Sequence, residues 1–184
     1  LVADHDHDHG AEIHQWLDPA IARDWIAVIA QVLAKADPDQ AQTYHANAAE
    51  AVARIDQLQA RLTALLTPAR DLPFIVGHDA YDGFAQAFGL TIAGSIAESD
   101  AAAPGAARLA DLRHVVRDAG VICLFPEAQS DPSYLQALAQ DSGVRMGAAL
   151  DPAGATLIPG PDLYAQLMTR LAQSIADCLL APEK

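Results

Sequence analysis

Apolar residues recur at intervals of three and four positions over the first third of the chain. The first stripe follows Asp18-Pro19, a capping residue and a proline that together favour a helix start. Its members are Ile21, Trp25, Val28, Ile29, Val32 and Leu33. A second stripe follows Asp37-Pro38 and meets no helix breaker before Pro68. At ~1.5 Å per residue, a helix over residues 39–66 is a rod of roughly 40 Å, longer than one small lobe requires.

After Pro68 the pattern changes to short apolar runs that alternate with helical stretches. The expected strands are Phe74–Val76, Thr91–Ile96, Val121–Phe125 and Val144–Ala149. The expected helices are Tyr81–Phe88, Ala106–Asp118, Pro132–Gln140 and Asp162–Leu180. This alternation predicts an α/β fold in which a parallel four-stranded sheet is flanked by helices. Ligands of such sheets bind beyond the carboxyl ends of the strands.

Composition and charge narrow the class of protein. The chain has 184 residues, of which 52% are hydrophobic, and a formal net charge of −13. Such an acidic chain is unsuited to nucleic acid or to anionic lipid, both of which need a surplus of Lys and Arg. No apolar run approaches the ~20 residues that span a bilayer. The chain begins at Leu1 rather than Met, so we expect a processed product or a fragment.

Three residues lie where the sheet rule would place a ligand site. His78 follows the strand Phe74–Val76, Asp151 follows the strand ending near Ala149, and His14 precedes the first helix. Imidazole and carboxylate are ligands of Zn²⁺, which prefers four donors arranged as a tetrahedron. The three residues also have ordinary structural interpretations. His78 can be a hydrogen-bonded histidine at a strand end, Asp151-Pro152 can form a turn, and His14 can pack at a lobe boundary.

Asp and His alternate three times near the start of the chain, where His5, His7 and His9 each follow an aspartate. Such a polar repeat cannot build a core, so a flexible segment with several weak metal contacts is expected. A purification-tag remnant is the alternative. No phosphate-binding glycine loop, Gly-x-Ser-x-Gly elbow or His-Glu-x-x-His motif is present, so no residue is assigned a catalytic role.

The two cysteines, Cys123 and Cys178, are separated by 55 positions without a Cys-x-x-Cys pairing. Two buried thiols in a cytosolic protein and a disulfide between strand and helix both fit this arrangement. The second would place the protein in an oxidising compartment.

Six short motifs, in order along nearly the whole chain, resemble those of the cluster A-I metal-binding solute receptors, in particular the zinc (ZnuA-type) branch. They are His14-Gln15-Trp16-Leu17-Asp18-Pro19, Gly77-His78-Asp79-Ala80-Tyr81, Pro104-Gly105-Ala106, Cys123-Leu124-Phe125-Pro126-Glu127, Leu150-Asp151-Pro152 and Ala176-Asp177-Cys178-Leu179. The His-rich run just before His14 lies where zinc receptors carry such a loop. Pro126, Ala128 and Ser130 depart from the family pattern around Glu127.

The resemblance implies two α/β lobes joined by a long rigid helix, with the metal held between the lobes. By this resemblance residues 1–17 are an acidic His-rich segment and short strand, and 18–37 a helix of an N-terminal lobe absent from this sequence. Residues 38–68 are the interlobe helix, and 69–184 the C-terminal lobe. The apolar face of the first helix, Trp25 included, is then expected to be exposed or covered by a partner chain.

The same resemblance implies a function and a site. His14 and His78 are expected to bind zinc, with Asp151 as a further ligand or a near neighbour, so that this chain supplies about three of four donors. It also implies the Cys123–Cys178 disulfide. The expected function is zinc capture in the periplasm and delivery to the permease of an ABC importer, without enzyme activity.

Three other functions compete with zinc capture. A manganese or iron receptor of the same family is disfavoured by the His-rich run. A zinc hydrolase would need an open coordination position and a general base near His14, His78 and Asp151, and no base is evident. A periplasmic zinc buffer or adhesin-like protein without a transporter differs from a receptor only in its partners.

Overall fold

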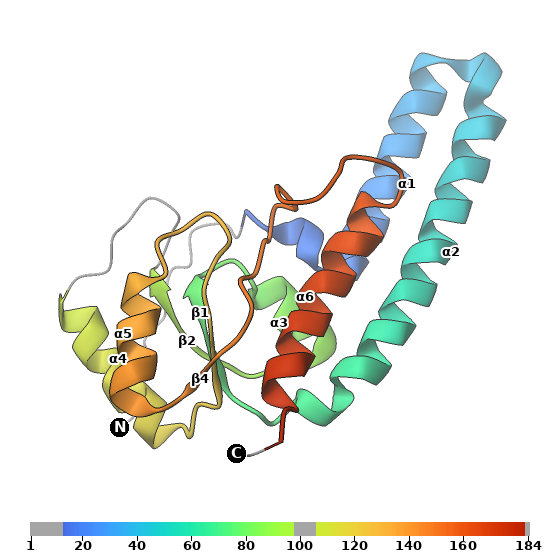
Figure 1. The fold of residues 1–184 in the computed structure, drawn as a ribbon. Helices are drawn as coiled ribbons and strands as arrows, with labels where there is room; N and C mark the ends of the chain where they lie inside the picture. The colour runs from blue at the N-terminus through green and yellow to red at the C-terminus, as the bar shows by residue number, and fades with distance from the viewer. Residues whose placement is uncertain (1–12, 98–105, 183–184) are drawn as a thin grey trace, which may run out of the picture.

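The two predicted helices form an antiparallel hairpin. The computed structural model of the protein describes residues 13–97 and 106–182. Helix α1 (Pro19–Ala36) begins where predicted, because the Asp18 carboxylate accepts a 2.7 Å hydrogen bond from the N–H of Ala20. A 3₁₀ turn (Pro38–Gln40) leads into α2 (Ala41–Leu66). The hairpin extends well beyond the sheet (Figure 1).

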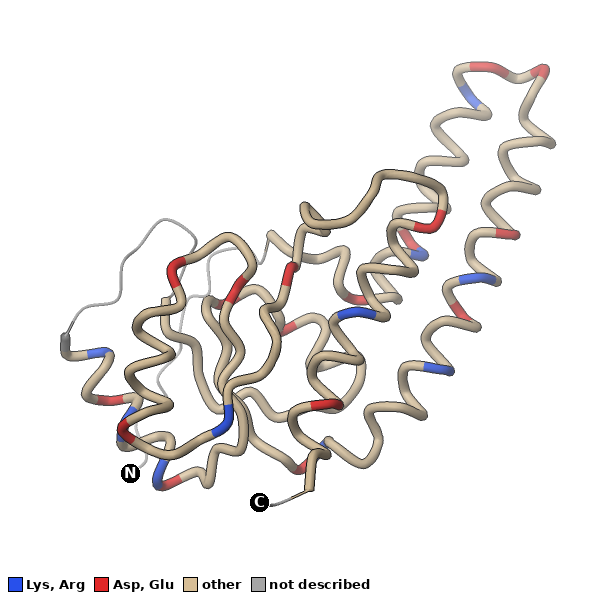
Figure 2. The backbone as a smooth tube through the Cα atoms, viewed as in Figure 1, with Lys and Arg blue, Asp and Glu red and all other residues tan. Residues whose placement is uncertain are grey.

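Helix α1 packs along α2 through small side chains, Ala22 and Ala30 being the buried alanines. The apolar stripe predicted for this helix therefore faces away from α2, and its larger members are 42–61% exposed. These are Trp25, Val28, Ile29, Val32 and Leu33. Figure 2 shows the corresponding stretch of α1 without a charged residue. No helix within the described ranges is long and apolar enough to cross a membrane.

A four-stranded parallel sheet follows the hairpin, as predicted. Its strands lie in the order β2-β1-β3-β4, so β1 and β3 are the central pair. Their bounds are β1 Phe74–His78, β2 Ile92–Ala97, β3 Cys123–Phe125 and β4 Arg145–Met146. The helices between and after them are α3 Asp82–Phe88, α4 Ala106–Asp118, α5 Ser133–Ser142 and α6 Leu163–Leu179.

Alternation of side chains along β1 and β3 divides the core between the two faces of the sheet. Phe74 and Val76 pack with α2, α3 and α6, while Ile75 and Leu124 pack with α4 and α5. Figure 1 shows the same division, with α4 and α5 on one side and α6 between the sheet and α2. Because helices cover both faces, the carboxyl ends of the strands open at one end of the lobe.

Strand β4 is shorter than the predicted strand Val144–Ala149. The partner strand β3 ends at Phe125, and the next residue is Pro126, which has no N–H to continue the ladder. Pairing resumes beyond it as a single bridge between Glu127 and Leu150. The sheet therefore extends toward Asp151 without a continuous strand.

Gly147, just after β4, lies against the ring of Phe125. A Cβ atom at this position would overlap ring carbon Cε1 of Phe125. Gly147→Ala is therefore expected to lower the free energy of unfolding by about 1–3 kcal/mol, the usual cost of overpacking a core. Chemical denaturation measures it, with Gly160→Ala as the matched control because no atom lies within 4 Å there. Equal stability of the two variants would contradict this close packing.

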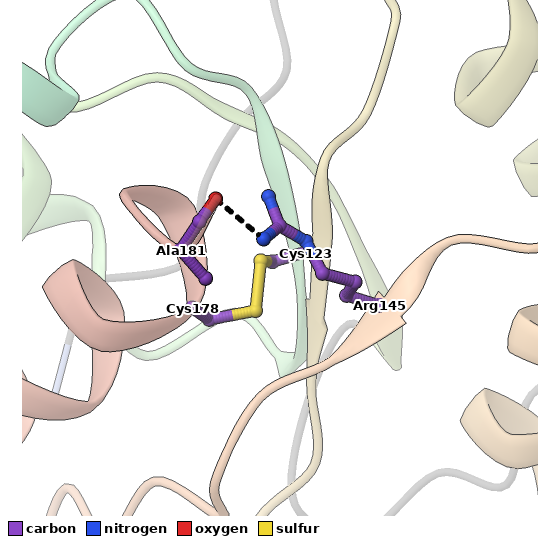
Figure 3. The surroundings of a disulfide bond; sticks show 4 residues. All are labelled: Cys123, Arg145, Cys178 and Ala181. Carbon is purple, nitrogen blue, oxygen red and sulfur yellow. Dashed lines mark hydrogen bonds between the residues drawn. A yellow bond between two sulfur atoms is a disulfide. The ribbon is translucent and has the colours of Figure 1, made fainter. Parts of the chain in front are cut away.

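The expected disulfide is present between Cys123 at the start of β3 and Cys178 in the last turn of α6. It joins a central strand to the C-terminal helix (Figure 3). Beside it the guanidinium of Arg145 donates a 2.8 Å hydrogen bond to the carbonyl of Ala181. These two bonds hold β4, β3 and α6 together at the end of the sheet opposite to the carboxyl ends of the strands.

Candidate metal centre

Three buried polar side chains meet at the carboxyl end of the sheet. Among the described residues, the buried polar or charged side chains are His14, His78 and Glu127, which are 7%, 4% and 8% exposed. His78 is the last residue of β1, Glu127 follows β3 by two positions, and His14 immediately precedes the 3₁₀ turn Gln15–Leu17. Burying polar groups is costly, so their gathering at one point marks a candidate functional site.

The two imidazoles are neighbours in an edge-on arrangement. The ring centroids of His14 and His78 are 5.2 Å apart, with an angle of 67° between the rings. A zinc–nitrogen bond is about 2.0–2.1 Å, so two imidazoles on one tetrahedral ion have centroids about 5 Å apart. The two rings therefore have the spacing that a shared zinc ion requires.

Glu127 contacts His78 and Tyr81 beside the two imidazoles. Its Oε1 lies 2.6 Å from Nδ1 of His78 and accepts a 2.7 Å hydrogen bond from the hydroxyl of Tyr81. Its other oxygen lies 3.5 Å from the hydroxyl of Ser130. Nδ1 of His78 therefore faces a carboxylate, and Nε2 is the ring nitrogen that would bind a metal in such an arrangement.

Asp151 lies close by, but its carboxylate holds its own loop. Together with His14 and Glu127 it lines a cavity of about 260 Å³. Its oxygens accept hydrogen bonds from the backbone N–H groups of Ala155 and Thr156 and from the Thr156 hydroxyl, at 2.7–3.1 Å. Partial burial alone would raise the pKa of Asp151, but these hydrogen bonds outweigh it and hold the pKa below its usual value.

The turn that carries His14 is fastened to the loop that carries Asp151. The indole N–H of Trp16 donates a 2.8 Å hydrogen bond to the carbonyl of Pro152, 136 positions away in the sequence. The Trp16 ring also packs edge-on against His14, with centroids 5.3 Å apart. The positions of His14 and of the Asp151 loop are therefore coupled.

The remaining ligands predicted from the sequence are the three histidines of the Asp-His repeat. His5, His7 and His9 fall outside the described residues. Within the ranges the structure describes, no group of three or more His, Cys, Asp or Glu side chains is arranged to hold a metal ion. The structure thus brings His14 and His78 together as a pair, and a third donor requires either a turn of the Asp151 carboxylate or a group from another segment.

Glu127 is the site residue that sequence reasoning missed. From the sequence it belongs to the motif Cys123-Leu124-Phe125-Pro126-Glu127 of the family resemblance, without a role of its own. Its position just beyond a buried central strand was the available signal, since the sheet rule that selected His78 and Asp151 selects Glu127 as well. His45 and His114 are exposed on α2 and α4.

With this geometry established, similarity to known proteins decides the family. The sequence profile of the family described as ZnuA, the periplasmic component A of the zinc-uptake complex, matches residues 2–178. The chain belongs to the ZnuA family. The high-affinity zinc uptake system protein ZnuA of Paracoccus denitrificans is 46% identical over 170 residues, and that of Brucella abortus is 42% identical over 168 residues.

These alignments cover 92% and 91% of this chain, but only 52% and 50% of the two relatives. The chain thus spans about half the length of the curated ZnuA proteins that it matches. A crystal structure of ZnuA superposes with a TM-score of 0.78 at 28% identity, covering 91% of this chain and 60% of that one.

Two other solved structures are also similar. A zinc-bound ZnuA deletion mutant gives a TM-score of 0.77 at 27% identity, over 94% of this chain and 62% of the mutant. The manganese-bound solute-binding protein FpvC of Pseudomonas aeruginosa gives 0.79 at 23% identity, over 91% and 63%. The likeness to FpvC shows the fold alone.

Proposed function

We propose that this chain captures Zn²⁺ in the periplasm as part of a receptor that delivers the ion to the permease of an ABC importer. The observation that carries the proposal is the buried pair His14 and His78, at the spacing of two imidazoles on one zinc ion. Membership of a family described as a periplasmic zinc-uptake component supports the cargo and the compartment. The names of the Paracoccus and Brucella relatives support them as well.

In this proposal His14 and His78 bind the ion through imidazole nitrogens, and Asp151 contributes a carboxylate oxygen. Asp151 has to share or release a hydrogen bond from its loop to do so. A donor from outside these residues completes the tetrahedron. A closed set of four protein donors leaves no position for a reactive water, which suits capture and release rather than an enzyme.

We also propose the division of the chain that the family resemblance implies. Residues 69–184 are the C-terminal lobe, 38–68 the interlobe helix, and 18–37 a helix that packs on an N-terminal lobe. The uncharged, exposed apolar face of α1 supports this division, because an apolar face of this size is normally covered. In this division residues 1–17 contain the accessory histidines His5, His7 and His9 and the first proposed ligand of the cleft, His14.

The test is a calorimetric titration of the chain with Zn²⁺ beside a variant in which His5, His7 and His9 are all replaced with Asn. Two classes of site are expected in the parent chain. The variant is expected to lose the weaker, multiple class and to keep one ion bound at His14 and His78. Loss of all zinc binding in the variant would overturn the assignment of the cleft, and preference for Mn²⁺ over Zn²⁺ would overturn the cargo.

A further inference from the structure

Glu127 is the buried carboxylate of the described part of the chain, and it contacts the proposed zinc ligand His78. One oxygen serves both Nδ1 of His78 and the hydroxyl of Tyr81. Tyr81 itself is 1% exposed, and its ring lies 6.1 Å from that of His78. A buried charge is retained only where it is paired, so this cluster is costly unless it serves the site.

The backbone around Glu127 is held on both sides. Glu127 bridges to Leu150, the N–H of Ala128 donates to the carbonyl of Leu150, and the N–H of Leu150 donates to that of Pro126. These bonds fix the Glu127 segment against the residue that precedes Asp151. The carboxylate is therefore presented to His78 by a rigid part of the fold rather than by a free loop.

A glycine makes room for the Glu127 side chain. Gly77 precedes His78 in β1, and a Cβ atom there would lie 3.0 Å from Cγ of Glu127 and 3.4 Å from its backbone nitrogen. Contacts this short force the neighbour to move. The absence of a side chain at position 77 thus allows Glu127 to reach past the strand to His78.

We infer that Glu127 is a positioning residue that holds His78 with its proton on Nδ1 and its Nε2 lone pair toward His14, Tyr81 holding the carboxylate in place. A carboxylate in contact with the second ring nitrogen of a histidine ligand fixes the tautomer and orientation of that ligand. This inference rests on the proposed zinc capture, but it predicts a state of His78 that exists before any metal binds.

The experiment combines zinc calorimetry with ¹⁵N NMR of the histidine rings in the metal-free chain. Glu127→Gln and Glu127→Ala are expected to weaken zinc binding at the cleft by about 10- to 100-fold, the usual effect of losing such a partner. In both variants the ring nitrogen shifts of His78 are expected to move from a single Nδ1–H tautomer toward a mixture. Tyr81→Phe, which leaves the carboxylate in place, is expected to produce a smaller change of the same kind.

Gly77→Ala is the independent probe, because it displaces Glu127 without altering any charge or hydrogen-bonding group. It is expected to reproduce the tautomer change of Glu127→Gln, with thermal unfolding confirming that each variant is folded. If zinc affinity falls while the His78 tautomer is unchanged, Glu127 acts as a ligand and the inference is wrong. If the tautomer changes but the parent chain binds no zinc at the cleft, positioning holds and the proposed function fails.

Discussion

Replacing His78 with Ala is expected to abolish the tighter of the two classes of zinc site. The change removes one of two neighbouring imidazoles and leaves His14 with Asp151, whose carboxylate already holds its own loop. The loss of affinity should therefore exceed the ~10- to 100-fold that follows from losing an outer hydrogen-bond partner. Competition for Zn²⁺ with a chelator of known affinity measures the change.

His45→Ala is the matched control, because His45 is an exposed histidine on α2, remote from the sheet. It should leave zinc affinity and stoichiometry at the parent values. Circular dichroism of the His78 variant tests whether the lobe is still folded, since Glu127 then lacks one of its buried partners. A folded His78→Ala chain that binds zinc as tightly as the parent would refute the cleft as the site of capture.

Removing the disulfide by Cys123→Ala with Cys178→Ala is expected to lower the free energy of unfolding by about 4 kcal/mol. The bond closes a loop of 55 positions, and the entropy of the unfolded chain rises accordingly when it is opened. The same bond anchors α6, whose buried face fills much of the core on one side of the sheet. Denaturant titration of the parent and the double variant gives the difference.

Parent chain treated with a reductant is the comparison that separates the bond from the side chains. It should unfold at nearly the same denaturant concentration as the double variant, because both lack the cross-link. An oxidised parent no more stable than its reduced form would show that the unfolded chain gains little freedom from opening the loop.

The helices and the sheet were predictable because their signals are local. Asp18-Pro19 set the start of α1 through a side-chain cap, and the change of apolar spacing after Pro68 marked the sheet. The end of β4 was not predictable from its own residues, because it depends on Pro126 in the neighbouring strand. Likewise, the apolar spacing of α1 marks one face, and only the packing of Ala22 and Ala30 reveals which face meets α2.

The candidate site residues were predictable where they follow the ends of predicted strands. The positions of the strand ends select His14, His78 and Asp151 as candidates, and the family resemblance implies that His14 and His78 bind the same ion. The role of Glu127 depends on a hydrogen bond across 46 sequence positions, to Tyr81, and on the space left at Gly77. Such contacts leave no periodic trace in a sequence, so the spacing pattern that located the strands could not locate this carboxylate.

The placing of the two tryptophans gives the molecule an optical property. Trp16 is partly buried, touches His14 and is bonded to the Asp151 loop, whereas Trp25 is 43% exposed on α1. A soluble quencher such as iodide reaches the exposed indole first and leaves the emission dominated by Trp16. The fluorescence that remains comes from the indole in contact with His14, so the proposed zinc binding can be followed in real time without attaching a dye.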